Sequence, residues 1–454
     1  MRTLAVNFFR ERIRNIHPRT RKANLNTFIG LVNKGAGLLI SLLLVPLTID
    51  YLSKDVYGTW LTISSIVTML TFLDIGIGNG LRNKFSEAVA NNKIDLARSY
   101  VSTAYAIFGL VQIVLILFCL IVFKYIPWQK VFNTNINETQ LEVVILLTVI
   151  AIAVKMTLDI VSYVLFALQE SSLVSLILFL SNVIIIFGTY MLSKWTVSNL
   201  TYLAIITSYS PIIVLLLGGF ILYRTRLKKY RPSFQLINRK YAKDLLQLGY
   251  KFFVIQLTVI VLFYTDNLII TQLFGPSEVT TYNVCFRYFN AINTIFGIVI
   301  TPYWSAFTEA YVKNDSAWMI QTHNYLQRLW VGLAVVVVIM MVAATPIYTV
   351  WVGNRVDIPV SLSIFMGLFV IISCWNNVAV SVINGMGKIK FQLILSLISA
   401  AINIPIAIFL GKYLNMGSAG VILATCLCLL IGSVFLSIQA KRLIHQEASG
   451  IWND

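Results

Sequence analysis

Apolar residues along this chain gather in long runs that are separated by short polar stretches. A helix that crosses the hydrocarbon core of a bilayer needs about 20 mostly apolar residues. Twelve runs approach or exceed that length, so the pattern predicts an all-α integral membrane protein with about 12 transmembrane helices. The predicted spans are residues 26–52, 56–77, 100–123, 143–168, 173–191, 200–223, 245–274, 279–307, 329–352, 360–383, 391–410 and 420–438.

Composition excludes a water-soluble protein. Hydrophobic residues make up 58% of the chain, charged residues make up 12%, and the mean hydropathy is +0.81. A soluble domain normally carries about 25% charged residues. The net charge of +17 would suit nucleic acid only if the cations formed a basic groove on a soluble module. They lie instead in short loops between spans, so we expect no nucleic-acid partner.

The distribution of Lys and Arg predicts the orientation of the chain in the membrane. With the N-terminus placed inside, 25 of the 35 Lys and Arg residues fall on the cytoplasmic side and six on the opposite side. The remaining four lie within spans. Because cytoplasmic loops carry an excess of positive charge, we expect a multi-pass protein with both termini in the cytoplasm.

The longest basic loop divides the predicted spans into six and six. We therefore expect two six-helix lobes, joined by this cytoplasmic linker and flanked by a basic, interfacial N-terminal segment and a cytoplasmic tail. The expected boundaries are 1–24 for the N-terminal segment, 25–223 for the first lobe, 224–244 for the linker, 245–439 for the second lobe and 440–454 for the tail.

The two halves also resemble each other weakly at their first hairpins. Residues 51–56 read YLSKDV, and residues 273–279 read LFGPSEV. In both, an acidic residue followed by Val opens the next span. This similarity indicates a duplicated six-helix unit, a plan found in secondary transporters whose substrate passes between the repeats.

Motifs for catalysis, metal binding or nucleotide binding are missing from the sequence. The cysteines lie in apolar runs without a CxxC pair, and the three histidines lie in separate polar segments. The chain has no GxxxxGK[ST] motif, which disfavours an ATP-driven pump. The predicted outer loops are short and hold no clustered carboxylates or histidines. We therefore expect neither an enzyme nor a bound cofactor or metal, with a proton or sodium gradient as the possible energy source.

Seven ionisable residues lie deep inside the predicted spans: Lys34, Asp74, Lys155, Asp159, Lys251, Asp266 and Arg287. A charge near the bilayer centre costs about 2.5–3.5 kcal/mol even on lenient insertion scales, so such residues face a bundle interior or a wet cavity. Two interpretations stay open. The residues contact substrate or a coupling ion, or they form the ion pairs Lys34–Asp74, Lys155–Asp159 and Asp266–Arg287.

The sign and position of these groups define the candidate site residues. The cations Lys34, Lys155, Arg287 and Lys251 are candidates for binding an anionic head group, although Lys251 is close enough to a span end to reach the inner interface. Asp159 and Asp266 are candidates for ion coupling. Asp74, Gly76, Gly80 and Arg82 are candidates for a structural or gating role, because small residues allow close helix approach.

The segment from the end of the second span resembles a recurring feature of polysaccharide flippases, the O-antigen or Wzx-type transporters of the multidrug/oligosaccharidyl-lipid/polysaccharide exporter superfamily. In that family an Asp-x-Gly-x-x-x-Gly-Leu pattern leads into an amphipathic inner loop. Here residues 72–83 read FLDIGIGNGLRN, followed by Lys84-Phe85-Ser86 and by Asp95-Leu96-Ala97-Arg98. The resemblance also includes Pro46 and Tyr57-Gly58.

The resemblance implies a fold, a location and a cargo. Such proteins have two six-helix lobes in a V-shaped, MATE-like arrangement within the bacterial cytoplasmic (inner) membrane. They move an undecaprenyl-pyrophosphate-linked oligosaccharide from the cytoplasmic to the periplasmic leaflet, driven by a cation gradient. The implied partners are this lipid-linked oligosaccharide, membrane lipids, and the polysaccharide polymerase with other assembly proteins. Lipid II flippases of the same superfamily usually carry two additional spans, which this chain lacks.

A cation-coupled multidrug (MATE-type) antiporter on the same fold is the alternative. A cationic drug requires net negative charge and aromatic faces in its cavity. Deep inside the predicted spans of this chain lie four cations and three carboxylates. This excess of positive charge favours an anionic cargo.

Overall fold

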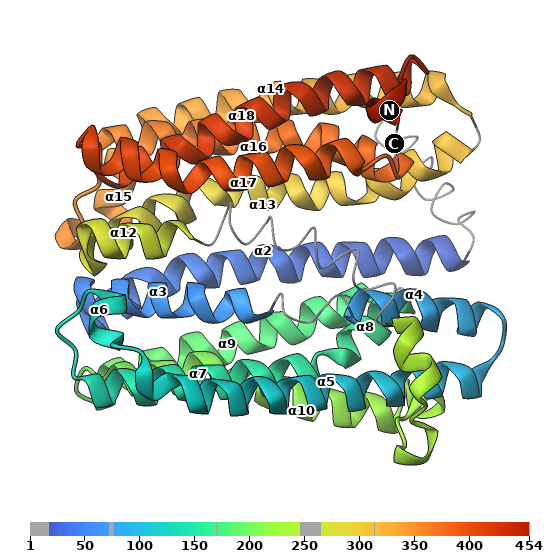
Figure 1. The fold of residues 1–454 in the computed structure, drawn as a ribbon, viewed down its shortest axis with the longest axis horizontal. Helices are drawn as coiled ribbons and strands as arrows, with labels where there is room; N and C mark the ends of the chain where they lie inside the picture. The colour runs from blue at the N-terminus through green and yellow to red at the C-terminus, as the bar shows by residue number, and fades with distance from the viewer. Residues whose placement is uncertain (1–17, 72–76, 169, 246–264, 313, 454) are drawn as a thin grey trace, which may run out of the picture.

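The computed structural model describes residues 18–71, 77–168, 170–245, 265–312 and 314–453. Every regular element among them is helical. Figure 1 shows two layers of long helices that run side by side, one from the first half of the chain and one from the second. We call them the N-lobe and the C-lobe.

The N-lobe contains helices α2 to α10. Their bounds are α2 Pro18–Leu52, α3 Lys54–Leu70, α4 Ile77–Ala90, α5 Ile94–Val122, α6 Trp128–Phe132, α7 Glu138–Leu158, α8 Ile160–Ala167, α9 Ser171–Trp195 and α10 Leu200–Arg224, with the 3₁₀ turn η2 at Phe123–Tyr125. The linker that follows contains the 3₁₀ turns η3 Lys228–Tyr230 and η4 Phe234–Leu236.

The C-lobe contains helices α12 to α18. Their bounds are α12 Asp266–Phe274, α13 Pro276–Val312, α14 Ser316–Val342, α15 Ala344–Trp351, α16 Val360–Met386, α17 Lys390–Ile408 and α18 Gly417–Ile444. Short elements join or follow them: η5 Gly353–Arg355, the π-helical turn η6 Phe409–Tyr413 and η7 Gly450–Asn453.

Ten helical segments in the described ranges are long and apolar enough to cross a membrane. They overlap ten of the twelve predicted spans. The other two, 56–77 and 245–274, extend into residues 72–76 and 246–264, which lie outside the described residues. The protein is therefore an all-α, multi-pass membrane protein, as the sequence predicts.

The predicted ninth span, 329–352, covers the second half of α14 together with α15, and its helix begins earlier than predicted. The helix here, α14, begins at Ser316 and ends at Val342. Its start is fixed by Asp315, whose carboxylate accepts a hydrogen bond from the backbone N–H of Trp318 at 3.0 Å. Such an N-cap satisfies a donor that the first helical turn leaves free. The polar first turns of α14 extend the helix beyond its apolar run, which is why hydropathy alone placed the boundary too late.

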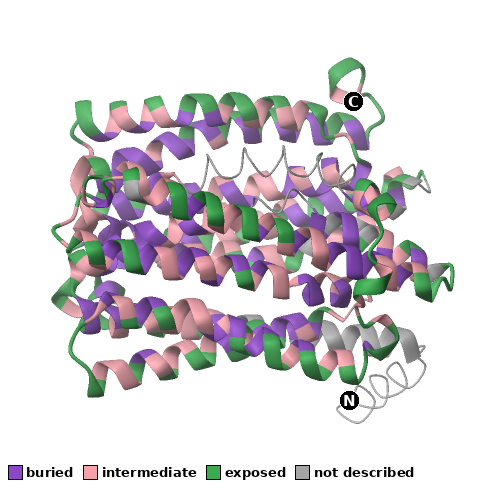
Figure 2. Ribbon diagram, turned by 60° about the horizontal axis from the view of Figure 1, so that its bottom comes forward, coloured by how far each residue is buried: buried purple, intermediate pink, exposed green. Residues whose placement is uncertain are grey.

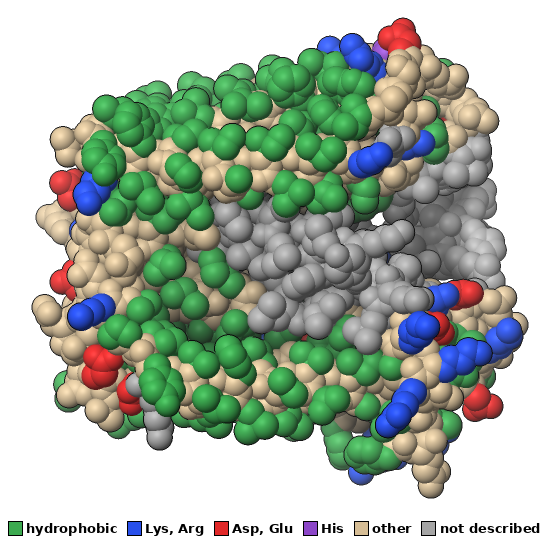
Figure 3. Space-filling view, in the orientation of Figure 1, with side chains coloured by type: hydrophobic (Ala, Val, Ile, Leu, Met, Phe, Trp, Pro, Cys, Tyr) green, Lys and Arg blue, Asp and Glu red, His purple; other side chains and the backbone are tan. Residues whose placement is uncertain are grey.

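Burial in the bundle has the pattern expected for a lipid solvent. Buried residues lie where helices face one another, whereas large apolar residues such as Ile121 and Phe187 are 68% and 62% exposed on the outside. Figure 3 shows apolar side chains over the flanks of both lobes, with charged side chains gathered at the two ends. A water-soluble protein does not expose so much contiguous apolar surface. The flanks are therefore the faces that contact lipid.

The ends of the bundle differ in charge. One end, the basic end, carries the α4–α5 turn, the linker, the α16–α17 turn and the end of α18; Lys and Arg side chains gather there on the right of Figure 3. The other, the far end, carries the α2–α3 and α12–α13 turns. An even number of predicted spans separates each basic loop from the next, so all of these loops lie at the same end of the bundle.

The two first hairpins share an unusual backbone conformation. Ser53, between α2 and α3, has φ 102° and ψ 160°, and Gly275, between α12 and α13, has φ 91° and ψ 167°. This region is populated almost only by glycine. Its occurrence at matching positions supports the duplicated unit that the sequence predicts.

The same two hairpins pack against each other across the lobes. The Thr280 hydroxyl donates to the carbonyl oxygen of Lys54 at 2.7 Å. A Cβ placed on Gly58 would lie only 1.7 Å from the carbonyl oxygen of Pro276. When the hairpins are aligned on Ser53 and Gly275, Lys54 corresponds to Pro276, and Gly58 corresponds to Thr280. A pseudo-two-fold axis therefore relates the Thr280–Lys54 contact to the Gly58–Pro276 contact.

Candidate functional site

The lobes are held together by polar contacts from the far end to the middle of the bundle. Arg355 forms an ion pair with Asp50 at the end of α2, and the Trp351 indole donates to the carbonyl oxygen of Leu42 at 2.9 Å. Thr62 and Thr271 hydroxyls lie 2.6 Å apart. Of the interlobe hydrogen bonds whose donor and acceptor groups are both described, those of Arg287 to Ser41 lie nearest the basic end.

Helix α12 supplies much of this interlobe contact. The Asn267 amide donates to the Ser65 hydroxyl at 2.6 Å. The Gln272 amide donates to the carbonyl oxygen of Lys130 at 2.8 Å, and the Asn133 amide donates to the carbonyl oxygen of Thr271 at 3.1 Å. These are neutral hydrogen bonds, each with a net value of about 0.5–1.5 kcal/mol. The same end also holds an apolar cluster with members from both lobes, among them Ile49 and Val279, so these hydrogen bonds are one part of the contact.

Arg287 lies on α13 at the inner limit of this contact. Its Nη1 donates to the carbonyl and hydroxyl oxygens of Ser41 on α2, both at 3.0 Å. The side chain is half-buried. No hydrogen bond from its Nε or Nη2 is present among the described residues, so donors of the guanidinium remain for an anion.

Asp266 does not pair with Arg287, contrary to one of the two interpretations of the sequence. Its carboxylate is 5% exposed; Oδ2 accepts a hydrogen bond from the Tyr282 hydroxyl at 2.7 Å, and Oδ1 has no partner within the described ranges. Tyr282 and Arg287 are five positions apart on α13. At about 100° per residue they point about 140° apart. Asp266 therefore faces the interior of the C-lobe, while Arg287 faces α2.

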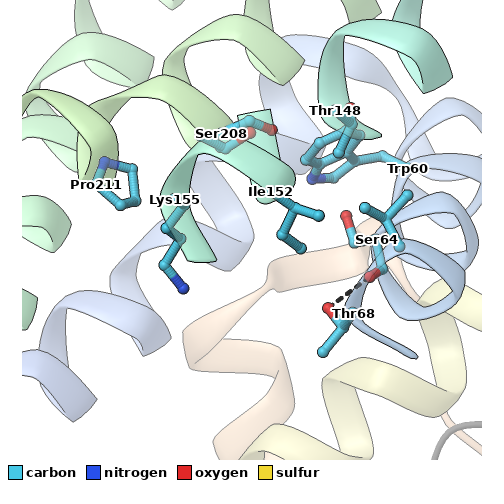
Figure 4. A pocket seen from close by; sticks show the side chains of 10 residues that line it. Trp60, Ser64, Thr68, Thr148, Ile152, Lys155, Ser208 and Pro211 are labelled. Carbon is cyan, nitrogen blue, oxygen red and sulfur yellow. Dashed lines mark hydrogen bonds between the residues drawn. The ribbon is translucent and has the colours of Figure 1, made fainter. Parts of the chain in front are cut away.

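A cavity of about 290 Å³ lies within the N-lobe, among α3, α7 and α10. Figure 4 shows its lining, with Ile152 between Trp60 and Lys155. The lining residues are Trp60, Ser64, Val67 and Thr68 from α3, Thr148, Ile152 and Lys155 from α7, and Thr207, Ser208 and Pro211 from α10.

Lys155 is the charged residue among the described residues of this lining. The i,i+4 ion pair with Asp159 does not form, because α7 ends at Leu158 and Asp159 occupies the junction with α8. Asp159 accepts a hydrogen bond from the Ser162 hydroxyl at 2.5 Å instead. Within the described residues Lys155 has no carboxylate partner. Its ammonium group is thus a fixed cation beside a cavity.

The hydroxyl groups of the cavity mostly present acceptor oxygens. Thr68, Thr148 and Thr207 each donate to a backbone carbonyl one turn earlier, at 2.6, 2.7 and 2.8 Å. A hydroxyl that donates in this way keeps lone pairs for another donor. The Ser64 hydroxyl is buried and has no partner among the residues described. The cavity therefore offers one cationic donor, several acceptors and the Trp60 ring.

The other residues singled out from the sequence lie elsewhere. Lys251, Asp74 and Gly76 lie outside the described residues, as does the side chain of Lys34, whose backbone belongs to α2. The Lys34–Asp74 pair thus stays a prediction. Gly80 is buried, and a Cβ there would come within 2.8 Å of the carbonyl oxygen of Leu245.

The basic face at the start of α4 and α5 is solvent-exposed. The Arg82 guanidinium lies 5.5 Å from the centre of the Phe166 ring. Lys84 donates to the Glu87 carboxylate at 3.0 Å, and this hydrogen bond raises the pKa of the Lys84 ammonium above its usual value. Arg98 donates to the carbonyl oxygen of Arg231, which ties the linker to α5. These cations mark the basic end.

Reasoning from charge missed the uncharged part of the cavity. Serine and threonine are ordinary constituents of membrane helices, so their presence alone is no signal. Their spacing is informative, because Ser64 and Thr68 are four positions apart, and Thr148 precedes Lys155 by seven. Both spacings place side chains on one helix face. No residue spacing in the sequence predicts that α10 forms the third wall of the cavity.

A family model described as polysaccharide biosynthesis protein matches residues 24–308 of the chain. A protein of Yersinia pseudotuberculosis named "Putative O-antigen export protein" is 21% identical over 405 residues, which cover 87% of this chain and 89% of the relative.

Solved transporter structures share the fold. An inward-facing multidrug resistance MATE family transporter superposes with a TM-score of 0.76 at 12% identity, over 93% of this chain and 98% of the other. An outward-facing MATE transporter gives a TM-score of 0.66 at 14% identity, over 94% and 96%. A transporter from Pyrococcus furiosus, described as having reverse polarity of its binding pocket, gives 0.66 at 13% identity, over 94% and 97%. The two-lobe architecture is therefore MATE-like.

Proposed function

This chain belongs to the polysaccharide biosynthesis protein family, and from that premise we propose that it flips an undecaprenyl-pyrophosphate-linked oligosaccharide from the cytoplasmic to the periplasmic leaflet. The observation that carries the proposal is Lys155. It is a fixed cation without a carboxylate partner in the described residues, beside a cavity lined with hydroxyl groups and Trp60.

The chemistry of this cavity suits a phosphorylated sugar. A pyrophosphate cannot enter hydrocarbon without compensation for its lost hydration. An ammonium group gives a charge-assisted hydrogen bond to a phosphate oxygen, about twice as strong as a neutral one. The acceptor oxygens of Thr68, Thr148 and Thr207 suit the hydroxyl donors of a sugar. Arg287 would supply a second cation from the C-lobe.

The position of the interlobe contacts supports a mechanism of alternating access. The lobes are joined at the far end, so entry would occur from the basic end, which positive-inside topology places in the cytoplasm. Release would require the contacts at Asp50–Arg355 and along α12 to separate. An exposed ion pair of this kind contributes only about 0–1 kcal/mol, so ligand binding can shift the balance between the two states.

Energy coupling is assigned to the intramembrane carboxylates. Asp266 is the stronger candidate, because it is buried in the C-lobe, with one oxygen bonded to Tyr282 and the other without a partner in the described part of the chain. A buried carboxylate without a cation partner favours uptake of a proton or Na⁺. Asp159, half-buried and bonded to Ser162, is the second candidate.

The cellular setting is part of the proposal. The chain would lie in a bacterial cytoplasmic membrane with both termini in the cytoplasm, and it would hand its cargo to a polysaccharide polymerase and other assembly proteins. The reaction would be transport without catalysis. A cation-coupled multidrug antiporter shares the fold, but a cavity whose charged group is an ammonium disfavours a cationic drug.

The proposal is tested by transport in proteoliposomes that contain the full chain. We expect a polyprenyl-pyrophosphate oligosaccharide to reach the opposite leaflet, and we expect Lys155→Ala to slow this movement at least tenfold. Lys194→Ala, at the exposed end of α9, is the matched control and should be neutral. Efflux of a cationic dye with no movement of the lipid-linked sugar would instead support the multidrug antiporter. Unchanged flipping by Lys155→Ala would show that the N-lobe cavity is not the site.

A further inference from the structure

A second cavity, of about 430 Å³, lies between the lobes. Its walls come from α2 and α9 of the N-lobe and α13 of the C-lobe, and Figure 1 shows α2 running between the other two. It lies on the basic-end side of the Arg287–Ser41 contact, since Thr294 follows Arg287 along α13 and Gly37 precedes Ser41 along α2. The described lining residues are Asn33, Gly37, Leu38, Ser175, Leu178, Phe179, Asn182, Thr294, Gly297 and Ile298.

The polar groups of the described lining residues are all uncharged. None of these residues is ionisable, in contrast to the N-lobe cavity with Lys155. Two are carboxamides, Asn33 and Asn182, and two are hydroxyls, Ser175 and Thr294. Among the described lining residues a phosphate would find no cation, and a metal or organic cation would find no carboxylate. The lining therefore suits a neutral ligand with hydrogen-bonding groups.

The donors and acceptors that the lining leaves free indicate which class of ligand would bind. The Asn33 Nδ2 is buried and has no partner within the residues described. The hydroxyls of Ser175 and Thr294 donate to the carbonyl oxygens of Ser171 and Asn290, at 3.1 and 3.0 Å, and so keep acceptor lone pairs. A ligand must then accept from amides and donate to hydroxyl oxygens at close range. A polyol does both with each hydroxyl group.

Two glycines and one aromatic ring give this lining its shape. A Cβ on Gly37 would come within 3.2 Å of the Asn182 Nδ2, whereas one on Gly297 would meet nothing within 4 Å. The glycines thus leave room for the amide and for a ligand. Phe179, Leu38 and Ile298 supply apolar surface for the C–H faces of a sugar ring. Mostly apolar walls with a few convergent polar groups are typical of small-molecule sites.

We propose that this interlobe cavity binds a neutral sugar ring of the transported oligosaccharide, a function distinct from charge recognition at Lys155. The inference rests on the proposed flippase function. Because both lobes contribute to the walls, movement of one lobe against the other would change the cavity. A ligand bound there would therefore favour one conformation over the other, as transport requires.

The test compares two ligands on the same purified, full-length protein in nanodiscs: undecaprenyl-pyrophosphate-linked oligosaccharide and undecaprenyl pyrophosphate without sugar. We expect Asn182→Leu and Asn33→Leu each to weaken binding of the glycosylated lipid about tenfold, since one or two hydrogen bonds are lost. Binding of the sugar-free lipid should not change. The control is Val183→Leu, which introduces leucine at the next position, on the exposed side of α9. It should leave the binding of both lipids unchanged.

The outcomes separate this inference from the proposed function. Lys155→Ala should weaken both lipids equally, because both carry the pyrophosphate. If the asparagine variants leave binding of the glycosylated lipid unchanged, or weaken binding of both lipids equally, the proposed sugar site is wrong. The proposed flippase function is not contradicted by either result. If the wild-type protein binds neither lipid, the proposed function fails. Thermal unfolding shows whether each variant is folded. If a leucine variant is not folded, Asn182→Ser takes its place, because serine shortens the side chain without adding apolar bulk.

Discussion

The Arg287 guanidinium on α13 donates to both the carbonyl and the hydroxyl oxygen of Ser41 on α2, and so joins the two lobes near the middle of the bundle. Each residue lies eleven positions from the far end of its helix, which corresponds to about 16 Å of helix. Arg287 is therefore part of the interlobe contact and also a cation at the inner limit of that contact. Substitutions can separate the two roles.

Arg287→Lys keeps the charge but removes the planar fork of donors, whereas Arg287→Ala removes both. We expect surface polysaccharide in cells to fall severalfold with Lys and to be nearly lost with Ala, at equal expression. Arg328→Ala, on an exposed position of α14, serves as the control and should leave the polysaccharide unchanged. Wild-type output from Arg287→Ala would contradict both roles.

Gly58 marks the closest approach of the two hairpins. Gly58→Ala would place a Cβ 1.7 Å from the carbonyl oxygen of Pro276, so the lobes must separate at the far end. We expect transport to fall at least tenfold while the protein still inserts in the membrane. Gly109→Ala in α5, where a Cβ would meet nothing within 4 Å, is the matched control. Equal activity of both variants would show that this contact is not needed.

Ser53 and Gly275 should respond to substitution in opposite ways. Ser53 adopts a conformation that costs a non-glycine residue about 1–3 kcal/mol, so Ser53→Gly should raise the thermal unfolding temperature in detergent. Gly275→Ala should lower it by a comparable energy. A fall in the unfolding temperature of Ser53→Gly would argue that its side chain stabilises the turn.

The Asp50–Arg355 ion pair can be examined by reversal of charge. Both side chains are nearly half exposed, so each single reversal should cost no more than about 1 kcal/mol of stability. We expect each reversal to impair transport by placing like charges at the far end. The double variant Asp50→Arg/Arg355→Asp should restore it. If the double variant is no better than the singles, the pair does not act as a contact between the lobes.

Asp266→Asn should uncouple transport from the ion gradient. The amide fits the same space and can still accept from Tyr282, so we expect normal folding. Because it carries no titratable group, transport should become slow and independent of an imposed pH or Na⁺ gradient in proteoliposomes. Asp357→Asn, on an exposed loop, should keep the wild-type dependence. Retention of the full gradient response by Asp266→Asn would assign coupling to another group, such as Asp159.

The class of the protein was readable from the sequence because its determinants are local. The length of apolar runs is fixed by bilayer thickness, and the excess of Lys and Arg fixes which loops share an end. Ten predicted spans overlap helices in the described residues. The helix of the ninth span begins earlier than predicted because the polar first turns of α14, capped by Asp315, carry no hydropathy signal.

The partners of the intramembrane charges were decided only by the tertiary structure. Sequence spacing allowed Lys155 to pair with Asp159, and Asp266 with Arg287, but Ser162 and Tyr282 bind the two carboxylates instead. The direction in which a side chain points depends on the rotation of its helix and on the helices packed around it, which no local pattern specifies. The same reason hid the uncharged lining of the two cavities, whose described walls come from three helices each. Hydrophobicity thus determined that the chain crosses the membrane, and helix packing determined what faces the path across it.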